Sequence, residues 1–123
     1  MSNPFADQAR FMEACGQTTL CHNTPQFVMY ETLIKEEYEE WIGALDDTEG
    51  ADAVVDLIVV LIGYALSKGW PIEALWNEVM RSNLAKIDPV TGLVRRREDG
   101  KVMKPPGWQA PDIANVLARG NAE

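Results

Sequence analysis

Residues 46–68 read DDTEGADAVVDLIVVLIGYALSK. Between residues 51 and 66 this stretch is apolar on nearly every side, which is typical of a helix buried in a bundle. Asp52 and Asp56 are the exceptions, and they lie one turn apart on the same helical face. An ionised carboxylate in an apolar setting is costly unless it binds a cation or takes up a proton. We therefore interpret 49–68 as a buried helix whose two aspartates have a function.

The preceding helix, predicted over 24–45, carries a second set of acids. Its apolar stripe consists of Phe27, Tyr30, Ile34, Trp41 and Leu45. Glu37 interrupts this stripe, and Glu36 and Glu40 flank it. The short connection 46–48 makes the two helices antiparallel neighbours, with facing residue numbers that add to about 94. Glu37 is then level with Asp56, and Glu40 is level with Asp52.

This crowding of negative charge predicts a metal site. Lys35 is the only basic residue nearby in sequence, so the acids cannot all be paired with basic side chains. Carboxylate oxygens select hard divalent ions, so we expect Mg²⁺ or Mn²⁺. The structural alternative is that 35–40 is a solvated surface and that Asp52 favours the helix start through the helix dipole. Asp56 is harder to explain this way, because it lies two turns into an apolar helix.

The rest of the chain adds two helices and an irregular arm. Asn3 and Pro4 predict a first helix over about 4–15, and Gly69 and Pro71 separate the central helix from a fourth over 71–86. Residues 93–103 resemble a hairpin that turns at Asp99-Gly100, and a short helix is expected over about 111–118. The sequence thus predicts an all-α helical bundle of about four main helices with a basic C-terminal arm.

Length and charge limit the function further. The chain has 123 residues, which suits a single domain over 1–123. Its formal charge of −8 argues against nucleic acid and membranes as partners, and the longest apolar run, 57–66, has half of the roughly 20 residues that a membrane span needs. The N-terminus shows no secretory signal, and we interpret Cys15 and Cys21 as free thiols. We expect a cytoplasmic protein.

Several motifs together resemble a known superfamily. They are the EExxE form of 36–40, the acidic segment 52–58, the Asn…Lys element within 81–86, the arm 100–106 and Pro111-Asp112-Ile113. In this order they resemble the short phage and bacterial branch of the MazG-like, all-α NTP pyrophosphohydrolases. That superfamily also contains dimeric dUTPases and phosphoribosyl-ATP pyrophosphohydrolases. The resemblance covers about 25–117.

The resemblance implies hydrolysis of a nucleoside triphosphate to the monophosphate and pyrophosphate, with two or three Mg²⁺ ions. It implies homodimers or homotetramers. Carried onto this chain, the catalytic residues would be Glu36, Glu37 and Glu40, and the metal ligands would be Glu37, Glu40, Asp52 and Asp56. One departure is that the second motif is usually ExxD, whereas Ala53 stands three residues before Asp56. Either Asp52 or Glu49 would then complete the motif.

Substrate contacts are expected in the last third of the chain. Asn83 interrupts the apolar stripe of the fourth helix, and Lys86 lies one turn further on. Five of the eleven basic residues fall within ten positions, namely Arg95, Arg96, Arg97, Lys101 and Lys104. We expect Asn83, Lys86, Lys101 and Lys104 to bind the substrate, and Trp108 to contact a base or an interface.

The base is left open by the sequence. Similarity to short phage-type proteins favours a purine deoxynucleotide such as dGTP. The alternatives are dUTP, phosphoribosyl-ATP, or a non-catalytic acidic helical dimerisation module that binds a cation or a basic partner. The Asn83 and Lys86 pair and the basic arm favour the enzyme, because a mere cation site needs neither.

Overall fold

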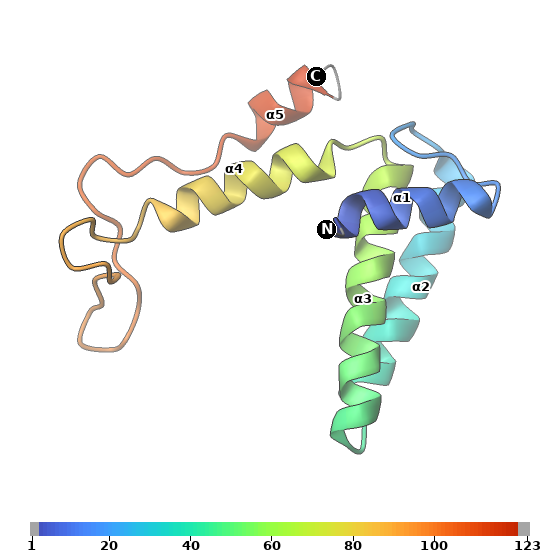
Figure 1. Cartoon of the computed structure of the whole chain (residues 1–123), viewed down its shortest axis with the longest axis horizontal. Coiled ribbons are helices and arrows are strands. Elements are labelled where there is room, and N and C mark those ends of the chain that lie inside the picture. The colour runs from blue at the N-terminus through green and yellow to red at the C-terminus, as the bar shows by residue number, and fades with distance from the viewer. Residues whose placement is uncertain (1–2, 121–123) are drawn as a thin grey trace. The chain divides into compact units, whose positions relative to one another are not determined.

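The computed structural model describes residues 3–120, which fold into helices and loops and contain no strand. The all-α prediction is therefore confirmed. The helices are α1 (Pro4–Ala14), α2 (Thr24–Ile42), α3 (Asp47–Ser67), α4 (Ile72–Leu84) and α5 (Ile113–Arg119), as Figure 1 shows. The described residues form two compact units, one reaching to Ile72 and the other spanning Glu73–Gly120.

The helix starts follow from their capping side chains. Asn3 accepts hydrogen bonds from the backbone N–H groups of Phe5 at 2.9 Å and Ala6 at 3.2 Å, with Pro4 as the first helical residue. Asp46 does the same for α3 by accepting from Glu49 N at 2.9 Å. The sequence predicts the connection at residues 46–48, but the two helices are joined by residues 43–46. Gly43, a poor helix former, ends α2 before the predicted Leu45.

The antiparallel pairing of α2 and α3 is confirmed, together with its register. Figure 1 shows the two helices side by side. Gln26 Nε2 donates to Ser67 Oγ at 2.7 Å, and the Tyr30 ring packs on Gly63. Both pairs of residue numbers add to 93, close to the predicted 94. The structure thus sets Glu37 at the level of Asp56.

The core of the first unit lies where α1 crosses this helix pair. It is built from Met12, Tyr30, Val60, Ile62 and Leu66, all buried. Only the first half of the apolar stripe of α2 packs into this core. Trp41 is 44% exposed and Leu45 is 90% exposed, so the prediction that both are buried is wrong. Trp41 lies in the last turn of α2 and Leu45 in the 43–46 connection, and neither packs against the core cluster around Met12 of α1.

The central helix α3 is less buried than its sequence predicts. Its last residues, 62–67, are buried or half-buried, but Val54, Ile58 and Leu61 are exposed and recur at helical spacing on one side. Among the described residues, α3 is the one helix long and apolar enough to cross a membrane, a property shared by core helices of soluble proteins. Its aspartates and its packing on α1 and α2 fit a core helix. An apolar face of α3 is nevertheless left uncovered.

The second unit consists of α4, the basic arm and α5. The predicted hairpin is confirmed as a turn with an isolated antiparallel bridge between Arg96 and Val102, without regular strands in the described chain. Gly100 closes the turn at a positive φ of 88°, where glycine is favoured, and donates to Arg97 O. Helix α5 begins at Ile113 with Asp112 as its cap. Val116 of α5 is buried.

Candidate functional site

Glu37 is the most constrained acid of the first unit. Its residue is half-buried, and its Oε2 atom is buried without a hydrogen-bond partner among residues 3–120. The pKa of Glu37 is raised to about 7 by burial first, then by the nearby carboxylate of Glu40, and then by the charges of Asp56 and Asp52. Glu37 therefore holds its proton to near neutrality unless a cation stands beside it.

The acids around Glu37 come from both helices, as the register requires. Glu40 lies one turn further along α2, and Asp52 and Asp56 lie one turn apart on α3. Asp56 is half-buried, whereas Asp52 and Glu40 are exposed. None of them forms an ion pair with a lysine or arginine of residues 3–120. We call Glu36, Glu37, Glu40, Asp52 and Asp56 the acid seam.

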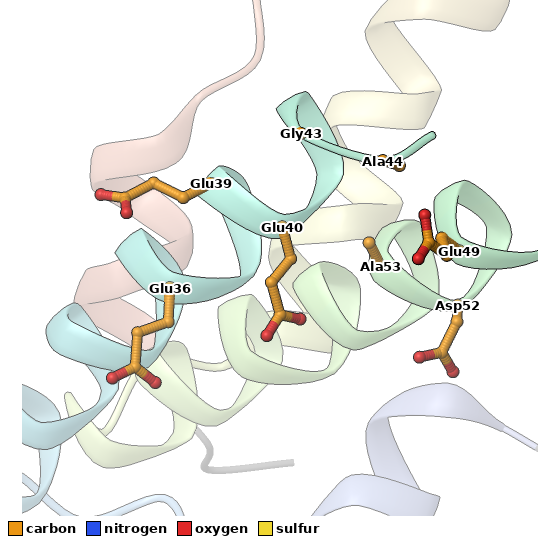
Figure 2. Close-up of a pocket in the computed structure, with 8 residues that line it drawn as sticks. All are labelled: Glu36, Glu39, Glu40, Gly43, Ala44, Glu49, Asp52 and Ala53. Atoms are coloured by element: carbon orange, nitrogen blue, oxygen red, sulfur yellow. The ribbon is translucent and has the colours of Figure 1, made fainter. Parts of the chain in front are cut away.

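An open pocket of about 620 Å³ adjoins this seam. It is lined by Glu36, Glu39, Glu40, Gly43, Ala44, Glu49, Asp52 and Ala53. Figure 2 shows the carboxylates of Glu36, Glu40 and Asp52 pointing to the same side, while Glu39 points away. Glu37 and Asp56 are outside the lining and lie nearer the core. The pocket is thus lined by acidic residues of both helices.

Glu49 has a structural task at the edge of the pocket. Its Oε2 atom accepts a hydrogen bond from Leu45 N at 2.9 Å, while its backbone N–H donates to Asp46. The two bonds close the start of α3 much as a capping box does, with the Glu49 side chain bound one residue before the cap residue Asp46. Glu49 and Asp52 are the two candidates for completing the second acidic motif. The carboxylate of Glu49 takes part in this cap, whereas that of Asp52 does not.

The acid seam has the donors for a hard cation but not a closed cage. Within residues 3–120, no three Asp, Glu, His or Cys side chains converge tightly enough to hold a metal ion as they stand. The shielded Oε2 atom of Glu37 is an unsatisfied acceptor, and buried acceptors of this kind call for a ligand. All the donors are carboxylate oxygens, which suit Mg²⁺ or Mn²⁺ rather than zinc. The residues present therefore fit the predicted ion in their chemistry.

The second unit gathers a different set of predicted residues. Lys86 Nζ and Lys104 Nζ lie 5.3 Å and 4.7 Å from the centroid of the Trp108 ring. Lys86 Nζ also donates to Asn83 Oδ1 at 3.2 Å. Asn83 lies beside Met80 on the predicted apolar stripe of α4, with Nδ2 4.0 Å from Met80 Sδ, but this stripe is largely exposed and Asn83 is exposed with it. The Asn83 amide lies on the surface of α4, within hydrogen-bond distance of Lys86 Nζ.

Lys101 does not share this arrangement. It lies in the hairpin turn, where its backbone N–H donates to Asp99 Oδ1 at 3.0 Å and its carbonyl accepts from Arg97 N at 2.8 Å. Its side chain is exposed. The structure thus brings together Asn83, Lys86 and Lys104 and leaves Lys101 apart from them.

A model of the phosphoribosyl-ATP pyrophosphohydrolase (PRA-PH) family matches residues 17–83, more than half of the chain. The chain belongs to this family. The PRA-PH family is part of the MazG-like all-α superfamily, so the superfamily indicated by the sequence motifs is confirmed. Its members are hydrolases that act on phosphoric anhydrides, and this chain is accordingly a nucleotide pyrophosphohydrolase. No curated protein matches the chain in a direct comparison.

The PRA-PH match contains the whole acid seam and ends at Asn83, before the three predicted substrate lysines. The role of each site residue therefore remains a prediction. Sequence reasoning missed two features of the geometry. Glu39, for which no role was predicted, lines the pocket, and its place in the EExxE run was the available signal. Trp108 contacts two lysines, for which no sequence spacing gave a signal.

Proposed function

We propose that this PRA-PH family member is a Mg²⁺-dependent nucleoside triphosphate pyrophosphohydrolase that produces a monophosphate and pyrophosphate. The observation that carries the proposal is the shielded, unpartnered Oε2 atom of Glu37 among acids that no basic residue of the described chain neutralises. A triphosphate adds further negative charge to such a site. Bound divalent cations would neutralise the negative charge of both the acids and the triphosphate.

The acid seam divides into ligands and a group that handles water. Glu37, Glu40, Asp52 and Asp56 would hold two or three ions, which on binding would neutralise phosphate charge and lower the pKa of a bound water. Glu36 points to the same side as Glu40 and Asp52 (Figure 2) and would orient the attacking water through its carboxylate. Water oxygen attacks the α-phosphorus, the bond from that phosphorus to the α,β-bridging oxygen breaks, and pyrophosphate leaves with the bridging oxygen.

The polar cluster of the second unit would bind the phosphates. Lys86 and Lys104 supply positive charge in a chain whose formal charge is −8, and Asn83 steadies Lys86. We assign a weaker role to Lys101, because its side chain is exposed on the hairpin. Charge-assisted hydrogen bonds from ammonium groups to phosphate oxygens are among the stronger polar contacts.

The preferred substrate in this proposal is a purine deoxynucleoside triphosphate such as dGTP. Support comes from the likeness of the motifs to short phage-type proteins. Phosphoribosyl-ATP is the second candidate, and the description of the matching family favours it. Both substrates release pyrophosphate through the same bond cleavage, so they differ in what must be recognised beyond the phosphates. A purely structural acidic module is set aside, because the family is enzymatic.

A second copy of the chain would cover the apolar face of α3. Val54, Ile58 and Leu61 are 41%, 49% and 48% exposed. An exposed apolar surface of this kind marks a contact with another protein chain. We propose a homodimer or homotetramer built on this face. Ile58→Glu would place a charge in that interface, and light scattering after size exclusion should then show a smaller species than the unmodified protein. A monomer before mutation would contradict this proposal.

The activity is tested by product analysis over a panel of substrates. The protein would be incubated with the canonical dNTPs, NTPs, dUTP and phosphoribosyl-ATP in Mg²⁺ or Mn²⁺, and products separated by anion exchange. We expect monophosphate and pyrophosphate from one class of substrate. Release of orthophosphate instead would place cleavage at another bond and contradict the proposal.

Matched glutamate variants separate the acid seam from the rest of α2. Glu37→Gln should reduce turnover on the order of 10²-fold or more, because it removes a ligand of the ions that would stabilise the transition state. Glu31→Gln makes the same chemical change at an exposed position of the same helix and should leave turnover unchanged. Similar losses in both variants would argue against a special role for Glu37.

A further inference from the structure

The indole of Trp108 is anchored to the end of α4. Its Nε1–H donates to the backbone carbonyl of Ser82 at 2.7 Å, across 26 positions of the chain. Helix α4 ends at Leu84, so the Ser82 carbonyl is one of the last four, which lack a partner within the helix. Trp108 therefore caps this helix end with its side chain. The bond fixes the orientation of the ring, which is half-buried.

The anchored ring in turn holds two like charges. Lys86 Nζ and Lys104 Nζ lie over the ring at 5.3 Å and 4.7 Å from its centroid, within cation–π range. Since both distances are measured to one centroid, the two nitrogens stand no more than about 10 Å apart. At low ionic strength, two ammonium groups within this limit repel each other. The ring face and the partial negative charge at the C-terminal end of α4 offset part of that repulsion.

We propose that Trp108 is a positioning residue that holds Lys86 and Lys104 as a paired binding site for a polyphosphate anion. The inference rests on the proposed function only in identifying that anion with the phosphates of the substrate. An anion that accepts hydrogen bonds from both ammonium groups would offset their repulsion, whereas each lysine alone would offer a single solvated charge.

The hydrogen bonds of the cluster leave donors for this anion. An ammonium group has three donors, and Lys86 uses one of them on Asn83 Oδ1. Lys104 contacts the ring through its positive charge, so this contact uses none of its three N–H donors in a hydrogen bond. A chain of linked phosphates presents oxygens at several positions along its length, so it can accept from both lysines together. An isolated carboxylate has only two oxygens and fits this spacing less well.

The test measures binding of inorganic tripolyphosphate without turnover. Isothermal titration of the full chain in EDTA and low salt excludes metal-dependent hydrolysis. We expect Lys86→Gln/Lys104→Gln to weaken binding at least tenfold and Trp108→Leu to weaken it by a similar factor. Trp108→Phe keeps an aromatic face but loses the bond to Ser82, so it should lose less affinity than Trp108→Leu. Arg10→Gln, an exposed charge on α1, is the matched control and should bind like the unmodified protein.

A combined variant shows whether Trp108 acts through the lysines. Added to Lys86→Gln/Lys104→Gln, the change Trp108→Leu should weaken tripolyphosphate binding no further. A full additional loss would mean that Trp108 contacts the anion itself, and equal affinity of the double lysine variant and the unmodified protein would mean that no such site exists. Either result overturns the proposal. Circular dichroism checks the fold of each variant, and Trp108→Phe keeps the test valid if Trp108→Leu unfolds. Because no substrate is cleaved, failure here is distinct from failure of the proposed activity.

Discussion

The Tyr30 ring of α2 lies so close to Gly63 of α3 that a Cβ atom at position 63 would stand 2.6 Å from Tyr30 Cζ and closer still to Cε1. Tyr30 cannot easily move aside, because it is 4% exposed and its hydroxyl donates to Gln17 Oε1 at 2.7 Å. This contact sets the register that brings Glu37 level with Asp56. Glycine at 63 is thus required by close packing of the two helices.

Gly63→Ala should destabilise the protein by about 1–3 kcal/mol, because overpacking forces the ring or the helices apart. Urea unfolding followed by circular dichroism would measure this. Gly50→Ala is the control in the same helix, where a new Cβ atom would make an ordinary 3.8 Å contact with Ala44. That change should stabilise the protein by about 0.5–1 kcal/mol through helix propensity. If position 63 accepted alanine as readily as position 50, the packing we describe would be incorrect.

The raised pKa of Glu37 predicts a pH dependence of stability in metal-free protein. The folded state binds the proton more tightly than the unfolded state, with a pKa of about 7 against an ordinary value of 4.5. The free energy of unfolding should therefore be highest below pH 4.5 as far as this group is concerned, and should fall as pH rises to about 7. Water screens these partly exposed acids, so we expect a loss on the order of 1 kcal/mol.

Glu37→Gln should remove this pH dependence, because the amide does not titrate. Above pH 7 the variant should be more stable than the unmodified protein in EDTA, since one charge of the acid seam is gone. Thermal unfolding between pH 4 and 8 would follow both proteins. A variant that is less stable at pH 8 would show that the Glu37 carboxylate is already compensated within the protein.

Glu78 links α4 to the start of α5. Its carboxylate accepts from Arg81 at 2.9–3.0 Å and from Asp112 N at 2.8 Å. The Arg81 hydrogen bonds, followed by that from Asp112, lower the pKa of Glu78 to about 2. Its stabilising contribution is thus complete above pH 4.5 and is lost as pH falls through about 2. Glu78→Gln should speed amide hydrogen exchange at Asp112, while Glu98→Gln in the exposed hairpin should not. Unchanged exchange at Asp112 would argue against the link.

Helices and register were predictable from the sequence because their signals are local. Asn3 and Asp46 are capping residues whose side chains bond to backbone groups within three positions. Short connections force neighbouring helices to pack antiparallel, so the level of Glu37 relative to Asp56 followed from counting residues. The EExxE run supplies three of the eight residues that line the pocket, because residues three and four apart share one side of a helix.

The errors concern burial and contacts made by the arm. Trp41 and Asn83 were assigned to an apolar face by spacing alone, but spacing does not tell whether another element covers that face. Trp108 meets Lys86 through an irregular segment, whose path depends on turns and not on a repeating pattern. The roles of the acids in chemistry depend on ions and substrate, which neither spacing nor packing supplies.

The central claim is that the acid seam binds divalent ions, and Mn²⁺ titration followed by electron paramagnetic resonance tests it most directly. We predict two or three bound ions per chain, with affinity reduced at least tenfold in Glu37→Gln and in Asp56→Asn, and unchanged in Glu31→Gln. Equal Mn²⁺ affinity in all four proteins, or no binding by the unmodified protein, would contradict the account.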